Sequence, residues 1–153
     1  MPKLALEFEM HADLALHDAG AGPFGQRMLF TVTGGDVAGD RVKGRLVGAS
    51  GDWLLAGPDG MGRLDVRATL ETSDGAIVLI QYHGVLELSP GVMAAVGGEG
   101  PATEYGAQYF FTAPRAETGD ERYAWMNRTV FLGQGRVLPG PAVEYRVFRV
   151  DND

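Results

Sequence analysis

The sequence lacks cysteine, long apolar runs and clusters of basic residues. Without cysteine, disulfides, thiolate metal sites and cysteine nucleophiles are excluded, and the chain suits a reducing cytoplasm, where we expect it to reside. No stretch of about 18 apolar residues is present, and the first residues alternate between apolar and charged, so we expect neither a membrane span nor a signal peptide. Acidic residues outnumber basic ones by 20 to 13, and the net charge of −7 disfavours nucleic acid as a partner.

Glycine, by contrast, is abundant, with 23 of the 153 residues. It follows no collagen-like period, so we interpret it as turns between short strands. Hydrophobic residues make up 45% of the chain, a proportion typical of globular proteins. The length fits a single domain that spans residues 1–153.

Apolar and polar residues alternate with a period of two along most of the chain, which predicts β-strands and no useful helix. In the clearest strand, the apolar residues from Leu64 to Leu70 take one face, and Asp65 and Arg67 take the other. We predict about nine or ten strands, with candidates at residues 4–11, 28–32, 40–49, 52–56, 63–72, 76–87, 105–113, 122–132 and 143–150. Short strands between such turns predict an all-β antiparallel meander closed into a barrel, or a sandwich; closure is favoured because it removes exposed edges.

The dipeptide Asp74-Gly75 predicts a two-residue hairpin loop of type I′. Counting back from that loop places Arg67 opposite Tyr82 and Asp65 opposite Gly84, so that a carboxylate, a guanidinium and a phenol share one face.

The turn at residues 57–60 concerns a second carboxylate, that of Asp52. If Ala56 pairs with Met61, Asp52 falls opposite Asp65. One of the two carboxylates then has a raised pKa unless Arg67 neutralises the pair.

Three interpretations of this charged face remain open. It is a solvated outer surface with a weak ion pair, a structural ion pair inside the barrel, or a polar pocket with a tunable carboxylate, a fixed cation and a phenol.

Aromatic residues gather in the second half of the chain, where core packing is their ordinary role. Tyr123, Trp125 and Asn127 share one face of a predicted strand, however, and such a wall suits a flat aromatic or carbonyl ligand. Trp53 is a further candidate for ligand contact, and the loop 114–122, which contains Glu117, is expected to cover the barrel mouth.

Motifs for metal, nucleotide or serine-hydrolase chemistry are missing from the sequence. The histidines lack metal-binding spacing, no GxSxG motif occurs, and the glycine-rich segment at residues 20–25 lacks the helix and lysine of a phosphate loop. We expect no metal and no cofactor.

Several short motifs resemble domain of unknown function (DUF) family 3237, in order and spacing, between Phe24 and Val150. They are Asp52-Trp53, residues 62–67 (GRLDVR), residues 72–76 (TSDGA), Tyr82-His83-Gly84, Glu117-Thr118-Gly119 and residues 123–127 (YAWMN). The resemblance implies a calycin-like β-barrel. It also implies that the barrel interior is lined by Asp65, Arg67, Tyr82, Trp125 and Asn127.

We therefore hypothesise a cofactor-free enzyme that performs acid/base proton transfer, as an isomerase, cyclase or hydratase, on a phenolic or keto-acid compound. Asp65, alone or with Asp52, is the expected general acid or base. Arg67 is expected to bind a substrate carboxylate or enolate, and Tyr82 to donate to a developing oxyanion.

Two alternative functions, neither of them enzymatic, stay open. The first is a non-catalytic binding protein for a small anionic or aromatic ligand that Arg67 anchors. The second is an interaction protein without a ligand, in which the aromatic strands form the interface of a homo-oligomer.

Overall fold

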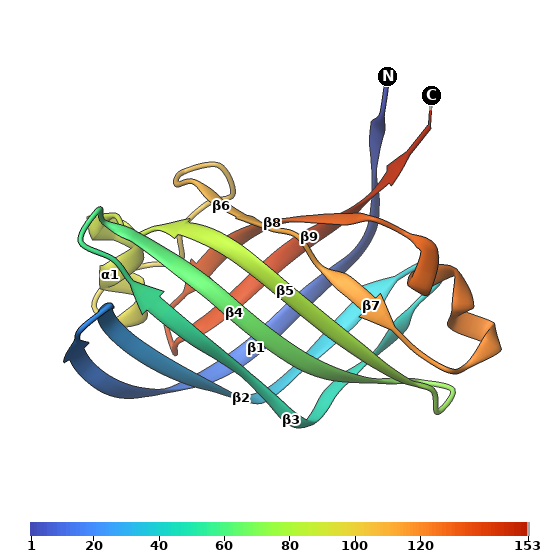
Figure 1. The fold of residues 1–153 in the computed structure, drawn as a ribbon, viewed down its shortest axis with the longest axis horizontal. Coiled ribbons are helices and arrows are strands. Elements are labelled where there is room, and N and C mark those ends of the chain that lie inside the picture. Colours follow the sequence, from blue (N-terminus) through green and yellow to red (C-terminus); the bar gives the residue numbers. More distant parts are fainter. Residues whose placement is uncertain (153) are drawn as a thin grey trace.

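Among residues 1–152, which the computed structural model describes, nine strands form one antiparallel sheet that closes on itself (Figure 1). Strands β1 to β5 pair in chain order, β5 pairs with β6 and β7, and β8 and β9 complete the ring to β1. The predicted antiparallel β-barrel is confirmed. The strands are β1 (Lys3–Gly22), β2 (Gly25–Gly39), β3 (Lys43–Ala56), β4 (Met61–Thr72), β5 (Ile77–Glu87), β6 (Phe110–Thr112), β7 (Arg115–Glu117), β8 (Phe131–Leu138) and β9 (Ala142–Asp151).

The alternating pattern of β4 shows why the sheet closes. Its residues Leu64, Val66, Ala68 and Leu70 are all buried in the barrel core, while the side chains between them lie on the outer wall. Because successive side chains point to opposite faces of a strand, one face of every strand fills the lumen.

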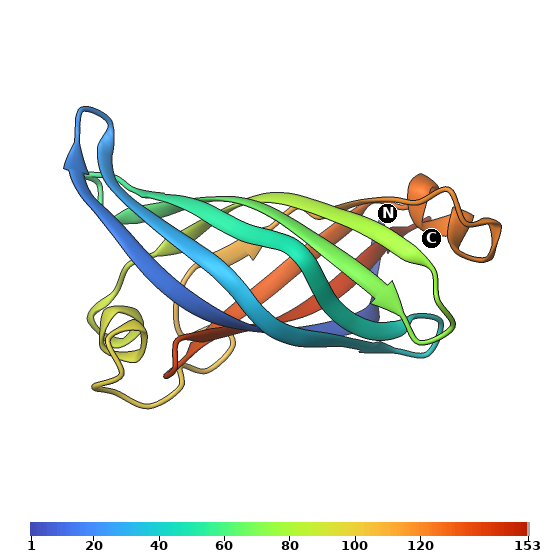
Figure 2. The same cartoon turned by 90° about the horizontal axis from the view of Figure 1, so that it is seen from below.

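Two short helical segments close the two ends of the barrel, contrary to the prediction of an all-strand chain (Figures 1 and 2). Helix α1 (Pro90–Val96) lies at one end and the 3-10 helix η1 (Glu121–Arg128) at the other. The strand predicted at 122–132 is therefore wrong over most of its length. Both segments are too short to show a helical period of apolar residues in the sequence. Each begins at a side-chain cap, which is Ser89 for α1 and Asp120 for η1. No helix among the described residues is long and apolar enough to cross a membrane.

The hairpin between β4 and β5 differs from its prediction by one residue. The amide of Gly75 donates to the carbonyl of Thr72 (3.0 Å), and the amide of Thr72 donates to the carbonyl of Ala76 (2.8 Å). Gly75 has φ +92° and Asp74 a negative φ, so this is a three-residue loop and not a type I′ turn. Arg67 consequently lies opposite Gln81, and Asp65 opposite His83. A one-residue slip turns each side chain of a strand to the other face relative to its partner, and the predicted face shared by Asp65, Arg67 and Tyr82 is wrong.

The turn between β3 and β4 also differs by one residue. Ala56 pairs with Gly62, and Asp52 lies opposite Val66 instead of opposite Asp65. Val66 in turn lies opposite Tyr82. Asp52, Val66 and Tyr82 therefore form one rung across three strands, and all three are buried inside the barrel.

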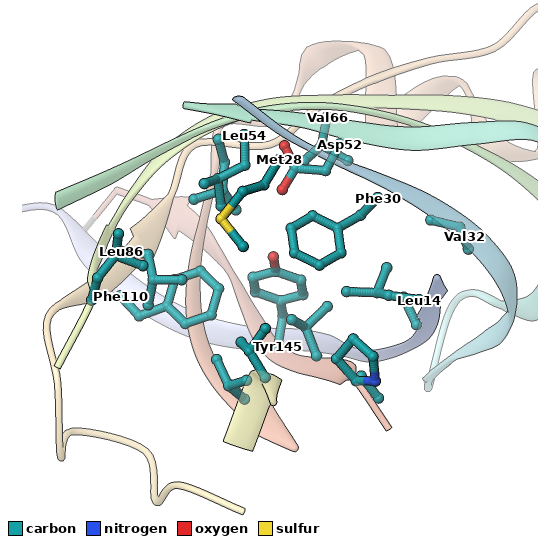
Figure 3. A pocket seen from close by; sticks show the side chains of 18 of the residues that line it. Leu14, Met28, Phe30, Val32, Asp52, Leu54, Val66, Leu86, Phe110 and Tyr145 are labelled. Carbon is teal, nitrogen blue, oxygen red and sulfur yellow. The ribbon is translucent and has the colours of Figure 1, made fainter. Parts of the chain in front are cut away.

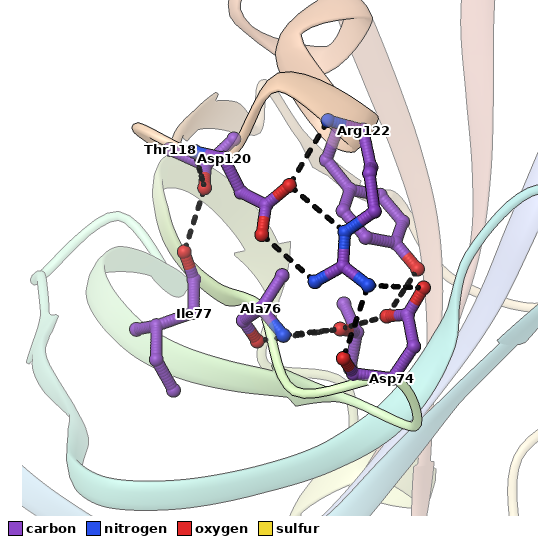
Figure 4. A network of polar contacts seen from close by, with 8 residues as sticks. Asp74, Ala76, Ile77, Thr118, Asp120 and Arg122 are labelled. Carbon is purple, nitrogen blue, oxygen red and sulfur yellow. Dashed lines mark hydrogen bonds and ion pairs between the residues drawn. The ribbon is translucent and has the colours of Figure 1, made fainter.

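A polar network joins the β4–β5 hairpin to η1 (Figure 4). Asp74 Oδ1 accepts hydrogen bonds from the hydroxyls of Thr72 (2.6 Å) and Tyr123 (2.7 Å). Arg122 donates to the Asp74 carbonyl (3.1 Å) and to the Asp120 carboxylate (2.9 Å). These bonds fix η1 over its end of the barrel.

Thr72 offers a test of the hairpin geometry. Its hydroxyl oxygen accepts from the buried amide of Ala76 (2.8 Å), so Thr72→Val leaves that amide without this acceptor at nearly unchanged side-chain volume. We expect a loss of about 1–3 kcal/mol in the free energy of unfolding, measured by urea denaturation. The matched control is Thr69→Val, whose lost bond from Thr69 Oγ1 to the Ala49 carbonyl is exposed, and it should lose less. Equal losses in the two variants contradict the assigned loop.

Candidate functional site

A cavity of about 50 Å³ lies inside the barrel toward the α1 end (Figure 3). Most of its wall is apolar, with contributions from Phe30 of β2, Leu54 of β3 and Phe110 of β6. Among the described residues that line it, three carry polar side-chain groups: Asp52, Tyr82 and Tyr145. An apolar pocket with a few convergent polar groups is the usual form of a small-molecule site.

Asp52 reaches the lumen because it lies two residues before Leu54 on the inward face of β3. A register shift between residues 47 and 51 precedes it and sets this alternation. Its Oδ1 accepts a hydrogen bond from the amide of Asp65 (3.1 Å). Figure 3 shows its carboxyl group directed into the cavity, toward the space that the Tyr145 hydroxyl also faces.

Burial raises the pKa of Asp52 from 3.8 to about 7. The main cause is burial, because the charged carboxylate loses its hydration. The nearby Asp65 carboxylate raises the pKa further, and the hydrogen bond from the Asp65 amide lowers it in part. No lysine or arginine is among the described residues that line the cavity. The carboxyl group therefore exchanges its proton near neutral pH.

Tyr82 and Tyr145 form the second polar element of the cavity. Their rings meet edge to face with centroids 5.4 Å apart. Burial, with the Asp52 charge adding to it, raises the pKa of both hydroxyls above the ordinary tyrosine value. Both hydroxyls are thus neutral hydrogen-bond donors at physiological pH.

The α1 segment, residues 89–102, covers the mouth of the cavity. Met93 and Val96 line the cavity, and Met93 remains 42% exposed on its other side. The backbone hydrogen bonds of this segment run within it, for example from Glu99 to Ala94 (2.9 Å). Bonds to the barrel flank it, from Leu88 to Gly60 (2.9 Å) and from Thr103 to Val137 (2.8 Å). Between these bonds the cover rests on apolar packing.

Two of the four predicted catalytic residues lie outside the cavity. Asp65 has a side chain that is 59% exposed and lies 3.3 Å from His83, and Arg67 is exposed on the same outer wall. The interior position that the family resemblance implied for them is wrong, because Leu64 and Val66 take the inward positions of β4. The structure brings the other two, Asp52 and Tyr82, together in the lumen.

None of the five predicted ligand contacts lines the cavity. Trp53 is 48% exposed because Asp52 and Leu54 take the inward positions beside it. Glu117 is exposed in β7, paired with Leu79, and the predicted loop 114–122 leads into η1 at the end of the barrel opposite the cavity.

The other three predicted contacts belong to η1 at the far end of the barrel. Asn127 exchanges hydrogen bonds with the backbone of Thr118 (2.8 and 2.9 Å), Trp125 lies under the Arg41 guanidinium, and Tyr123 bonds Asp74. The interior position implied for Asn127 is wrong, because its segment is helical and its side chain is exposed, whereas Trp125 is half-buried and packs against the core from the η1 end.

Sequence reasoning missed Tyr145. The signal was present, since Val143, Tyr145 and Val147 alternate with Glu144 and Arg146 along β9, which places the tyrosine on the apolar face. Its position beside Asp52 and Tyr82 could not be predicted from the sequence, because β9 and β3 are far apart along the chain.

No group of three or more histidine, aspartate and glutamate side chains suited to a metal ion occurs within residues 1–152.

The model of the DUF3237 family, described as protein of unknown function, matches residues 2–150. The chain belongs to the DUF3237 family. Similar members include the UPF0311 protein blr7842 of Bradyrhizobium diazoefficiens, 31% identical over 114 residues, or 74% of each chain. Another is the UPF0311 protein RPA1785 of Rhodopseudomonas palustris, 29% identical over 71% of each chain.

Solved structures share the fold of this DUF3237 protein. That of RPA1785, described as a conserved protein of unknown function, superposes with a TM-score of 0.87 at 25% identity and 99% coverage of both chains. A protein from Acinetobacter baumannii, described as β-barrel like, gives a TM-score of 0.81 at 25% identity, covering 99% of this chain and 97% of its own.

The raised pKa of Asp52 predicts a specific pH dependence of stability. Between pH 4 and 7 the unfolded chain has lost this proton and the folded protein still holds it, so stability falls as the pH rises through this window and levels off above about 7. Asp52→Asn keeps a hydrogen-bond acceptor and removes the charge. We expect it to stabilise the protein relative to wild type by up to about 4 kcal/mol at pH 8 and little at pH 4, in urea denaturation.

Asp36→Asn, on the outer wall of β2, is the control and should follow the wild-type pH profile. A stability difference between Asp52→Asn and wild type that does not change with pH contradicts a proton held by the buried carboxyl.

Opening of the α1 segment is testable because the chain has no cysteine of its own. Val92 of α1 and Val78 of β5 are both 0% exposed. We expect the thiol of Val92→Cys to react with a thiol reagent at least about tenfold faster than that of Val78→Cys, because local opening needs less free energy than unfolding of the barrel. Rates are compared after the unfolding free energy of each variant is measured. Equal protection at the two positions rules out independent opening.

Proposed function

We propose that this DUF3237 protein is a cofactor-independent enzyme that transfers protons on a small, neutral phenolic or carbonyl compound bound in the barrel. The observation that carries the proposal is the carboxyl group of Asp52, buried in an apolar cavity, with a pKa raised to about 7, opposite two neutral tyrosine hydroxyls. A group that titrates near the working pH serves as both acid and base.

In this proposal Asp52 acts as the general base. Its carboxylate takes a proton from the carbon next to a carbonyl, or from a phenolic hydroxyl, and the electron pair of the broken bond moves onto the substrate oxygen or carbon framework. The protonated carboxyl then returns the proton at another atom of the substrate. The result is an isomerisation, a ring closure or an addition, with no external reagent other than the substrate and water.

Tyr82 and Tyr145 stabilise the oxygen that becomes negative during this transfer. A neutral hydroxyl in a dry cavity is a strong donor to an oxyanion, because little water competes for the bond. The edge-to-face packing of Tyr145 against both Tyr82 and Phe110 (5.3 Å) holds its ring in place, so the donor is positioned before the substrate arrives.

The lining also limits the class of substrate. With no lysine or arginine along the described wall of the cavity, an anionic ligand would meet only Asp52 and neutral groups. This argues against the keto-acid part of our sequence hypothesis, in which Arg67 was to bind the carboxylate, and favours neutral phenols and ketones. A structure from Penicillium herquei is described as an enzyme and has a TM-score of 0.69 at 22% identity, so the likeness concerns the fold alone.

A non-catalytic role with the same cavity is the second candidate. The predominantly apolar wall favours it, because an apolar wall can bind a small apolar compound without any reaction.

The test begins with thermal shift measurements against neutral phenols and aryl ketones, paired with the corresponding carboxylic acids. Hits among the neutral compounds are then followed by NMR for proton exchange in deuterated water. We expect exchange in the wild type, a loss of about 100-fold or more in Asp52→Asn, and a loss of about 10²–10³-fold in Tyr145→Phe.

Asp36→Asn on the outer wall serves as the control and should keep the wild-type rate. Binding without exchange in the wild type supports the non-catalytic role. Exchange that survives Asp52→Asn overturns the enzymatic proposal.

A further inference from the structure

An uncharged apolar face covers part of the outer wall of the barrel. We define this outer apolar face by Leu4 and Leu6 of β1, Phe148 of β9, Leu132 of β8 with Val130 just before that strand, and Phe111 of β6. Outward positions of a barrel in water are ordinarily polar, as they are in β4.

Strand register shows that these side chains are contiguous. Leu6 lies opposite Phe148, and Phe148 opposite Leu132, which makes one rung across β1, β9 and β8. Leu4 lies opposite Val150, whose amide donates to the Val130 carbonyl (2.9 Å), which makes a second rung beside it.

The face continues onto β6 and β5. Phe111 lies opposite Gln134, two residues along β8 from Leu132, and opposite Val85 on its other side. Tyr109 packs on Phe111 with ring centroids 4.9 Å apart. The two rungs contain no charged side chain, and the extension is bordered by Arg146, opposite Gln134, and by Arg63, opposite Val85.

The exposed fractions make this face unusual for a monomer. They are 57% for Leu4, 51% for Leu6, 66% for Val130, 39% for Leu132 and 41% for Phe111. Monomeric proteins rarely expose contiguous apolar patches beyond about 300–600 Å². With Tyr109 and Val85 included, the exposed area is on the order of the ~800 Å² per partner that a stable interface buries.

We propose that the outer apolar face packs against the same face of a second copy of this chain. At this face β9 is paired on both sides, with β1 and with β8, so contact through it has to be made face to face. Each copy carries a net charge of −7, and two copies repel unless they meet where neither presents a carboxylate. The two uncharged rungs meet that condition, and an apolar face is complementary to itself across a two-fold axis.

The interface is separate from the proposed reaction site. None of the residues that define the outer apolar face lines the cavity that holds Asp52. Variants of the face therefore report on assembly and leave the carboxyl group and its tyrosines unchanged, so either proposal can fail without the other.

The first experiment measures mass by size-exclusion chromatography with light scattering between about 1 and 100 µM, in the affinity range of weak to moderate complexes. We expect the wild type to show at least twice the chain mass of 16.3 kDa. The double variant Leu6→Glu/Leu132→Glu should be monomeric and folded by circular dichroism. Ile77→Glu, which replaces another apolar side chain (52% exposed) on the outer wall away from this face, should keep the wild-type mass.

The second experiment does not depend on the stability of a charged variant. Because the chain has no cysteine, Leu6→Cys and Ile77→Cys each introduce a single thiol. We expect Leu6→Cys, which lies near its symmetry mate, to form a disulfide-linked dimer at least about tenfold faster than Ile77→Cys under mild oxidation, because pairing raises the local thiol concentration.

A monomeric wild type across the concentration range overturns the proposal, as does an unchanged mass of the double glutamate variant. A monomer that associates through this face with a different macromolecule or a lipid surface also overturns it, since the proposed occupant is a second copy.

Discussion

The pleat of a closed sheet is the constraint on which the rest of this structure depends. Each side chain of a strand points either into the lumen or to the outer wall, and a neighbour in sequence takes the opposite choice. Asp52 is therefore inside and Trp53 outside, and Tyr82 is inside while His83 meets Asp65 in solvent. The chemistry of the interior follows from which member of each pair takes the inward position.

The buried carboxyl group of Asp52 lowers the stability of the folded state when it is ionised. An ionised Asp52 loses its hydration, accepts a hydrogen bond from the Asp65 amide and meets no cation along the described cavity wall. An apolar residue at this position would pack with Leu54 and Val66 at no such cost. Enzymes commonly carry buried titratable groups in their reaction sites at a cost to the stability of the fold. The buried Asp52 carboxyl group, beside two buried hydroxyls, has this character.

The two ends of the barrel are held by different forces, and this separates rigidity from access. At the η1 end, Asp74, Thr72, Tyr123 and Arg122 form directional polar bonds between the hairpin and the helix. At the α1 end, the cover is tied at its two flanks and otherwise held by non-directional apolar contact. Apolar contacts re-form after displacement without a geometric penalty, so the end beside the cavity is the one suited to admit a ligand.

The sequence by itself determined the class of structure and named two members of the site, Asp52 and Tyr82. Alternation indicated the strands and the barrel, but counting from the turn at residues 57–60 placed Asp52 opposite Asp65 on the charged face, whereas in the structure it lies opposite Val66 inside the barrel. Only the tertiary structure decided which residues meet. A three-residue loop with Gly75 at positive φ and a two-residue loop have the same sequence signature, yet they differ by one residue in register and exchange the partners across the hairpin. The meeting of Tyr145 with Asp52 and Tyr82 depends on closure of the sheet between β9 and β1, and no local pattern encodes such long-range pairing.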